Sequence, residues 1–231
     1  MSAQPSEDHS SEVPSERSLF LFPKWANRLP FFFISGSVLF LLFVIFLFWY
    51  VFSPKNLDVG YAPKQPIPFS HQLHAGELGI DCRYCHSTIE KSGHAALPNT
   101  ETCMNCHKII KADSPHIIKL RDSYANNKPI EWIQVHRLPD YAYFDHSAHL
   151  RAGVSCVSCH GRVDQMPVVH QVQPLSMSWC LECHRAPEKF LRPKEFITKL
   201  DWKAEDQLKL GLHLKEVNHI RPREDCNTCH R

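Results

Sequence analysis

The pattern Cys-x-x-Cys-His occurs five times in this chain of 231 residues and uses all ten of its cysteines. The cysteines are Cys82, Cys85, Cys103, Cys106, Cys156, Cys159, Cys180, Cys183, Cys226 and Cys229, and the histidines that complete the patterns are His86, His107, His160, His184 and His230. In such a pattern two thiols can add to the two vinyl groups of a porphyrin, and the adjacent imidazole can coordinate its iron. The sequence therefore predicts five covalently bound haem c groups, each with a proximal histidine.

A cysteine pair by itself is also typical of a redox disulfide, of half a zinc site or of a disulfide-stapled domain. None of these alternatives requires a histidine directly after every pair. Haem attachment does require it, and the histidine is present after all five pairs. This regularity favours haem.

Histidines that can fill the second axial position of the irons occur just before two of the patterns. Phe69-x-His71-x-x-His74 precedes Cys82, and the same spacing returns as Phe144-x-His146-x-x-His149 before Cys156. Two imidazoles three residues apart on one helical turn cannot both reach one iron, so we expect each pair to serve two haems. The predicted distal ligands are His71, His74, His146 and His149.

Two other residues are candidates for the remaining axial position. His136 lies near Pro139 among apolar residues, a setting that favours a fixed, partly buried side chain, and it is the fifth predicted distal histidine. Met177, three residues before Cys180, is the alternative, and a methionine ligand would raise the potential of its haem. A methionine in this position can equally pack against a porphyrin. Irons with both axial positions filled carry electrons and bind no substrate.

We expect the haem-binding part of the chain, residues 67–231, to have arisen by duplication. A two-haem unit at 67–110 returns at 141–187, and the fifth haem is attached at 226–230. Proline and short motifs favour small helices and loops over sheet. The predicted fold is mostly α and irregular, with a core dominated by haem.

The stretch 29–52 contains no charged residue and predicts a transmembrane helix. At about 1.5 Å per residue it reaches roughly 36 Å, against a hydrocarbon core of about 30 Å. A cleaved signal peptide is the alternative, but the apolar run is longer than the usual signal-peptide core and no small-x-small cleavage site follows it. The sequence therefore favours an uncleaved anchor.

The segments on either side of this stretch differ in composition. Residues 1–28 are polar and mixed in charge, which predicts a disordered tail, and residues 53–66 are rich in proline, which predicts a semi-rigid spacer. Arg17, Lys24 and Arg28 precede the apolar stretch, so the positive-inside rule puts the tail in the cytoplasm. We therefore expect a single-pass protein of the inner membrane with its haem domain in the periplasm.

The formal net charge of +2 does not include the haem propionates. Five haems would bring ten carboxylates, so we expect several basic residues to bind propionates rather than nucleic acid. Arg83, Arg162 and Arg185, within or directly after attachment motifs, are candidates for this role. No glycine-rich phosphate loop and no Ser-His-Asp pattern indicates a hydrolytic site.

The order of these motifs resembles a known family. After one apolar N-terminal stretch come FSHQLHAGELGIDCRYCH, PNTETCMNCHK, YFDHSAHLRAGVSCVSCHG, PLSMSWCLECHR and a terminal CNTCHR. The series is similar to the membrane-anchored pentahaem cytochrome c subunit of alternative complex III, and more widely to class III, cytochrome c7-like multihaem domains. In those domains Phe-x-His-x-x-His supplies distal ligands.

The resemblance implies an electron-transfer subunit of a membrane quinol:electron-acceptor oxidoreductase. The implied partners are an iron–sulfur subunit with a molybdopterin-enzyme-like fold and polytopic membrane subunits that oxidise menaquinol or a similar quinol. The implied acceptor is a monohaem cytochrome c or a terminal oxidase.

Two other classes of protein share part of the pattern. A stand-alone membrane quinol dehydrogenase that feeds periplasmic reductases also has one anchor helix, but it usually carries four haems that begin soon after the membrane. Here about thirty residues intervene between the apolar stretch and the first motif. A multihaem reductase with an open iron usually replaces one proximal histidine by lysine, whereas all five motifs here end in histidine.

Overall fold

The computed structural model describes residues 22–52 and 58–230. Most of the predicted tail and the first part of the predicted spacer, 53–57, lie outside the described residues. The described chain separates into two compact units, which meet in sequence between Val51 and Phe52.

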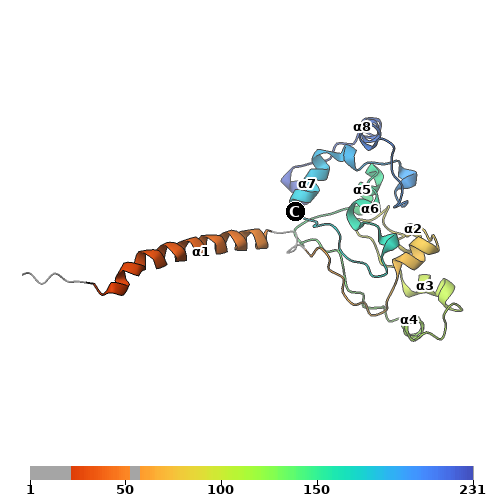
Figure 1. The fold of residues 1–231 in the computed structure, drawn as a ribbon. Coiled ribbons are helices and arrows are strands. Elements are labelled where there is room, and N and C mark those ends of the chain that lie inside the picture. Colours follow the sequence, from red (N-terminus) through yellow and green to blue (C-terminus); the bar gives the residue numbers. More distant parts are fainter. Residues whose placement is uncertain (1–21, 53–57, 231) are drawn as a thin grey trace, which may run out of the picture. The chain divides into compact units, whose positions relative to one another are not determined.

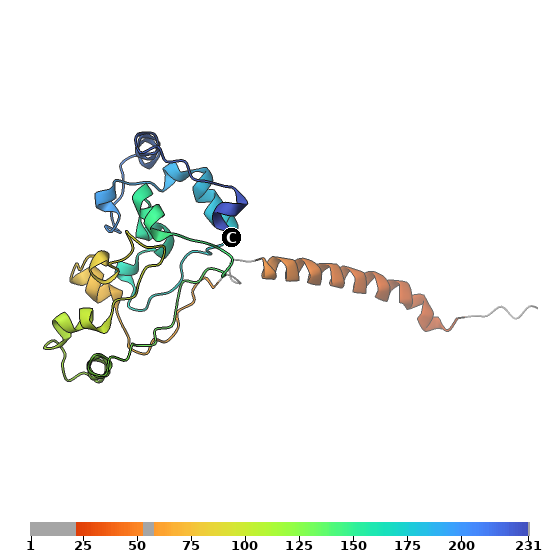
Figure 2. The ribbon, with the colours of Figure 1, turned by 180° about the vertical axis from the view of Figure 1, so that it is seen from behind.

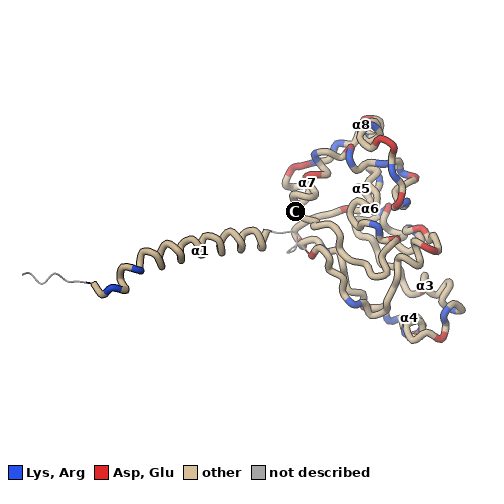
Figure 3. The backbone as a smooth tube through the Cα atoms, in the orientation of Figure 1, with Lys and Arg blue, Asp and Glu red and all other residues tan. Residues whose placement is uncertain are grey.

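The first unit contains a short 3-10 helix, Lys24–Arg28, and α1, Leu29–Val51 (Figure 1). Together they form the one helix in the described chain that is long and apolar enough to cross a membrane, with a mean hydropathy of 2.8. None of its side chains is buried, and its only charged residues, Lys24 and Arg28, precede the apolar run (Figure 3). A helix that is apolar all round suits a lipid environment.

The second unit is an assembly of short helices and loops, in agreement with the predicted fold. Its α-helices are α2 Cys82–Cys85, α3 Thr100–His107, α4 Pro115–Ala125, α5 His146–Ala152, α6 Cys156–His160, α7 Met177–Arg185, α8 Gln207–Val217 and α9 Cys226–Cys229. Single helical turns occur at η3 Gln72–Glu77, η4 Val163–Gln165, η5 Pro187–Lys189 and η6 Lys194–Phe196. No strand occurs in the described part of the chain, where only two isolated bridges join Ala142 to His230 and Val154 to Leu191.

Side chains next to the motifs begin several of these helices. Asn99 accepts a hydrogen bond from the backbone N–H of Thr102 at the start of α3, and Asp145 accepts one from Ala148 at the start of α5. Such caps satisfy N–H groups that the first helical turn leaves unpaired. The motif helices therefore begin where the local sequence dictates.

The protein core of this unit is small. Ile67, Met104, Ile117 and Leu120 form one buried cluster, against which Trp132 and other side chains pack. Many other large apolar side chains stay exposed, among them Ile109, with 86% of its surface accessible. So little buried apolar surface is expected where cofactors supply much of the core.

The described end of the predicted spacer is attached to this unit. The backbone N–H of Gly60 donates to the carbonyl of Gln171 over 2.7 Å, and the N–H of Gln171 donates to the carbonyl of Tyr61 over 3.1 Å. The side chain of Gln65 both donates to and accepts from the backbone of Ile133. Residues 60–65 are therefore held by the haem-binding unit.

Helix α8 packs tightly against η5. Gln207 donates to the carbonyls of Glu188 and Leu191, and Lys215 forms a 2.9 Å ion pair with Glu188. Gly211 lies at the closest approach, where a Cβ atom would run into the carbonyl oxygen of Glu188. Glycine is therefore required here by the space between helix and turn.

We expect Gly211→Ala to lower the free energy of unfolding of the haem-loaded protein by about 1–3 kcal/mol because of overpacking. Helix propensity alone would give the opposite sign, since alanine stabilises an open helical position by about 1 kcal/mol over glycine. The control is Leu212→Ala, an exposed neighbour on α8. Thermal unfolding followed by circular dichroism measures both variants, and a stabilised Gly211→Ala would contradict the packing described here.

Candidate haem-attachment sites

Each cysteine pair lies on one helical turn. The pairs occupy α2, the end of α3, α6, α7 and α9, and no disulfide joins any of the ten cysteines. Residues three apart on a helix lie on the same face, so both sulfurs of a pair can reach one porphyrin edge. The motif histidine ends the turn or follows it directly.

Three predicted distal histidines lie opposite motif histidines. The ring centroids are 6.2 Å apart for His74 and His107, 6.5 Å for His146 and His160, and 6.1 Å for His149 and His184. Two imidazoles bound to one metal through nitrogens at about 2.0 Å each have ring centroids about 6 Å apart. The three separations therefore fit an iron between the rings, which is the test that a bis-histidine haem site must pass.

Backbone carbonyls hold the orientation of these rings. Four motif histidines donate from Nδ1: His86 to Ala96 over 3.0 Å, His107 to Ile110 over 3.0 Å, His184 to Arg223 over 2.7 Å and His230 to Tyr141 over 3.2 Å. Three predicted distal histidines do the same: His74 to Ser70 over 2.9 Å, His146 to Gly93 over 2.9 Å and His149 to Asp145 over 2.7 Å. A carbonyl can only accept, so the proton is on Nδ1 and Nε2 is left with its lone pair. Nε2 is thus the nitrogen available to a metal.

The two Phe-x-His-x-x-His segments have the same geometry. Phe69 stacks on His74 at 4.4 Å, and Phe144 stacks on His149 at 4.5 Å. Each phenylalanine also meets its first histidine edge-on, at 4.9 Å in the first copy and 4.7 Å in the second. The aromatic ring therefore separates the two imidazoles of each pair and directs them apart.

His71 is the predicted distal histidine left for His86, the other motif histidine of the two-haem segment 67–110. Burial and the nearby charges of His86 and His74 lower the pKa of His71 to about 4. Its Nδ1 atom is buried and has no hydrogen-bond partner. A neutral, buried imidazole suits metal ligation, because the metal binds the unprotonated nitrogen.

His136 occupies a different position from the other predicted distal ligands. Its ring meets that of His160 edge-to-face at 4.4 Å, which is too close for an iron between them, and His160 already faces His146. Burial lowers the pKa of His136, and its buried Nε2 atom has no hydrogen-bond partner. The structure therefore brings His136 to a motif histidine, but at contact distance.

Met177 begins α7, three residues before Cys180, and its side chain is 59% exposed. Near the fifth motif, the ring of His230 lies 5.9 Å from that of Tyr141. Predicted distal histidines thus lie opposite the motif histidines of the second, third and fourth motifs, whereas the axial partners of His86 and His230 do not follow from the ring contacts.

The three arginines considered as propionate partners already have carboxylate partners. Arg83 pairs with Asp81 at 2.9 Å, Arg162 with Asp164 at 2.6 Å and Arg185 with Glu224 at 3.2 Å. The hydrogen bond from Arg83 holds the pKa of the Asp81 carboxyl well below its usual range. A guanidinium has five N–H donors and can bind a second carboxylate beside its own acid, so the propionate role stays a prediction.

Sequence reasoning missed the backbone carbonyls that orient the imidazoles. Any residue type offers such an oxygen, so no sequence signal marks Ala96, Arg223 or Tyr141 for this role. It also missed the 2.9 Å hydrogen bond from Asn105, inside the second motif, to the hydroxyl of Tyr84, inside the first. The amide and phenol groups at the variable positions of these two motifs are the sequence signal that could have found it.

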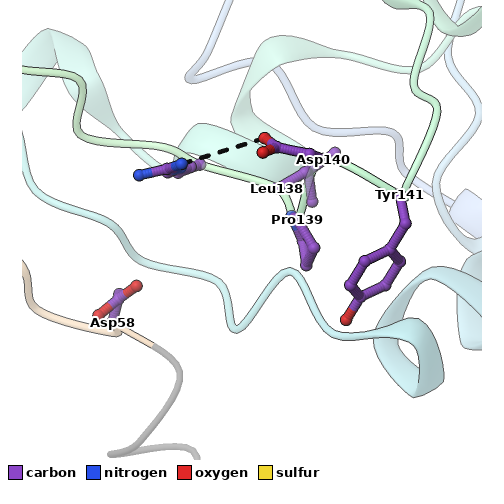
Figure 4. A pocket seen from close by; sticks show the side chains of 6 residues that line it. Asp58, Leu138, Pro139, Asp140 and Tyr141 are labelled. Carbon is purple, nitrogen blue, oxygen red and sulfur yellow. Dashed lines mark ion pairs between the residues drawn. The ribbon is translucent and has the colours of Figure 1, made fainter.

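A shallow hollow of about 430 Å³ adjoins the fifth motif. Asp58, Arg137, Leu138, Pro139, Asp140 and Tyr141 line it, with Asp58 and Tyr141 on opposite sides in Figure 4. The ion pair between Arg137 and Asp140 spans 4.0 Å, and Asp140 is almost fully exposed, so solvent screens the pair strongly. Tyr141 links this hollow to the fifth motif through the hydrogen bond from His230.

Comparison with known proteins agrees with the haem-site geometry. Over 114 residues the chain is 35% identical to a protein of Nitratidesulfovibrio vulgaris named "Menaquinone reductase, multiheme cytochrome c subunit". The alignment covers 48% of this chain and 51% of the relative, so the chain spans about half the length of the curated relative that it matches. The family profile described as "Cytochrome c7 and related cytochrome c" matches residues 67–126 and 142–231, most of the second unit. The chain therefore belongs to the family of cytochrome c7 and related cytochromes c, whose members carry c-type haems.

Proposed function

We propose that this chain is the electron-relay subunit of a membrane quinol:electron-acceptor oxidoreductase, with five haem c groups in a periplasmic domain anchored by one transmembrane helix. The observation that carries the proposal is the spacing of three histidine pairs at 6.1–6.5 Å. A haem held between two imidazoles gains and loses one electron and offers no open site for a substrate. Such a ligand set supports relay rather than catalysis.

The ring geometry supports a distal histidine for the second, third and fourth motifs, and the repeated Phe-x-His-x-x-His spacing extends the pattern to the first. The proposed pairs are His71 with His86, His74 with His107, His146 with His160 and His149 with His184. Backbone carbonyls orient six of these eight rings, all but those of His71 and His160. A donor to a carbonyl strengthens the basicity of the ligating nitrogen, and this tunes the potential of the iron.

We assign Met177 to the fifth motif. The ring of His136 lies against that of His160 in the third motif, so we place His136 outside the fifth site. His184 and Arg185 on α7 contact Arg223 and Glu224, so α7 lies near the fifth motif. The exposed Met177 thioether on that first turn is not committed to the apolar core. Histidine–methionine ligation would give this haem a higher potential than the bis-histidine sites.

The name of the relative supports a quinone as the redox partner of the complex. That protein is described as a subunit of a menaquinone reductase. Together with the resemblance in motif order, this supports assembly with an iron–sulfur subunit of molybdopterin-enzyme-like fold and with polytopic quinol-binding subunits, as in alternative complex III. The acceptor would be a monohaem cytochrome c or a terminal oxidase.

The decisive experiment compares the whole complex, purified in mild detergent, with the isolated haem-loaded chain. We expect menaquinol to reduce the haems of the complex and not those of the isolated chain, and a monohaem cytochrome c to reoxidise them. Reduction of the isolated chain at the same rate would identify a stand-alone quinol dehydrogenase. Fewer than five haems per chain by pyridine haemochrome, or a high-spin signal in the native protein, would contradict the relay.

His149→Ala tests the distal assignment. We expect a single haem to become high-spin while the others stay low-spin, because the iron opposite His184 loses its sixth ligand. Electron paramagnetic resonance and magnetic circular dichroism measure the change. His213→Ala, which removes an exposed histidine on α8, is the matched control and should leave the spectra unchanged. An unchanged spectrum for His149→Ala would refute the assignment.

Met177→Leu tests the fifth site. We expect loss of the near-infrared signature of histidine–methionine ligation and a lower potential for one haem, since the thioether ligand is gone. Met104→Leu is the control, because Met104 is buried in the apolar core and a swap of similar volume is tolerated there. The assignment fails if both variants keep the native near-infrared spectrum.

A further inference from the structure

We infer that the five attachment sites lie in one unbranched row whose order differs from that of the sequence: second, first, third, fourth, fifth. The sites are numbered along the chain, so that the first ends at His86, the second at His107, the third at His160, the fourth at His184 and the fifth at His230. The inference rests on the proposed function, because it requires a haem at every motif.

Within the first two-haem segment, 67–110, one helical turn holds the first and second sites together. His74 on η3 faces His107 of the second site, and His71, the distal ligand proposed for the first site, directly precedes η3. The hydrogen bond of 2.9 Å between Tyr84 and Asn105 joins the two motifs directly. The first and second sites are therefore neighbours.

In the second two-haem segment, 141–187, α5 holds the third and fourth sites together in the same way. His146 faces His160 of the third site, and His149, one turn later, faces His184 of the fourth. Residues three apart on a helix are about 5–6 Å apart at their Cβ atoms, so the two sites must lie close together. The third and fourth sites are therefore neighbours.

The two-haem segments 67–110 and 141–187 join at the first and third sites. Asp81 and Ser155 directly precede Cys82 and Cys156, the first cysteines of these motifs. One short segment contacts both motifs: Thr198 donates to Asp81 over 2.8 Å, and Ser155 donates to the carbonyl of Ile197 over 2.6 Å.

A second contact joins the same two segments. The N–H of Gln72 on η3 donates to the carbonyl of Met166, which follows η4, over 3.1 Å. Gly76 lies so close to the backbone of Asp164 that a Cβ atom would run into its carbonyl oxygen. The turn that carries the distal histidine of the second site thus packs on the segment just after the third motif.

The fifth site extends the row beyond the fourth. His184 donates to the carbonyl of Arg223 over 2.7 Å, and Arg185 pairs with Glu224 at 3.2 Å. Both partners directly precede the fifth motif at Cys226, and α9 lies beside α7 in both views (Figures 1 and 2). The fourth site is therefore the neighbour of the fifth.

The second and fifth sites are the ends of this row. Figures 1 and 2 place α3 and α4 at one end of the domain, with α2 and α6 in the middle. Ile109, two residues after His107, is 86% exposed. The row therefore leaves the second and fifth sites as the two places where electrons enter and leave the chain.

Two variants on the same turn test the order in the purified complex. His71→Met and His74→Met each exchange one distal ligand, and each raises the potential of its own haem. That haem is then reduced before the remaining bis-histidine haems, and its added negative charge lowers the potentials of its neighbours by an amount that falls with distance. Potentiometric titration followed by electron paramagnetic resonance resolves which haems shift.

We expect His71→Met to shift two other haems, those of the second and third sites, and His74→Met to shift only the haem of the first. A shift in the third- or fourth-site haem caused by His74→Met would overturn the order. The iron positions in a cryo-electron microscopy map of the unmodified complex decide the matter independently of both variants. Among pairs with one iron from each two-haem segment, the first and third irons should be the closest. Any other closest pair would refute the row. An incorrect order with five low-spin haems present would leave the proposed function standing.

Discussion

The hydrogen bond from an imidazole Nδ1 to a backbone carbonyl is the interaction on which the haem sites depend. It places the proton on one ring nitrogen, leaves the other nitrogen free for iron and restricts rotation of the ring. Since the carbonyls of Ala96, Ile110, Arg223 and Tyr141 lie in loops, the ligand geometry depends on loops rather than on long helices. This explains how a domain of short helices, with no strand among its described residues, can hold rings at well-defined separations.

The second constraint is the pairing of two imidazoles on one short helical element. Because His146 and His149 lie three residues apart on α5, each ring faces a different motif histidine. The stacked Phe144 keeps the rings apart, and the same arrangement recurs around Phe69. One helical turn thus supplies a ligand to each of two sites and keeps the two sites close together. Rapid electron transfer requires such a short distance between sites.

Polar and charged contacts complete the fold where apolar packing is sparse. The buried cluster around Met104 belongs to α3 and α4, while α8 is held on η5 by Gln207 and by the Lys215–Glu188 pair. In the backbone view of Figure 3, positions of Lys and Arg are interspersed with positions of Asp and Glu along the second unit. Net stabilisation from such exposed pairs is small, and bound porphyrin would supply the apolar contact that the chain lacks.

The sequence by itself determined the chemistry. Covalent attachment needs two thiols and an imidazole at fixed spacing, so the cysteines, the motif histidines and the mostly α, irregular fold could be predicted from local pattern. The apolar stretch of α1 was equally evident, because a membrane span is a property of one contiguous segment. The Phe-x-His-x-x-His repeats pointed to His74, His146 and His149, which the structure places opposite motif histidines.

Only the tertiary structure decided which residues meet across the chain. It placed His136 against His160, paired Arg83 with Asp81 and brought Thr198 to Asp81. None of these contacts follows from spacing, because each depends on the path of loops between residues far apart in sequence or on competition between nearby charged partners. Backbone carbonyls as orienting groups were likewise beyond sequence, since every residue carries one and only the fold selects which of them faces an imidazole.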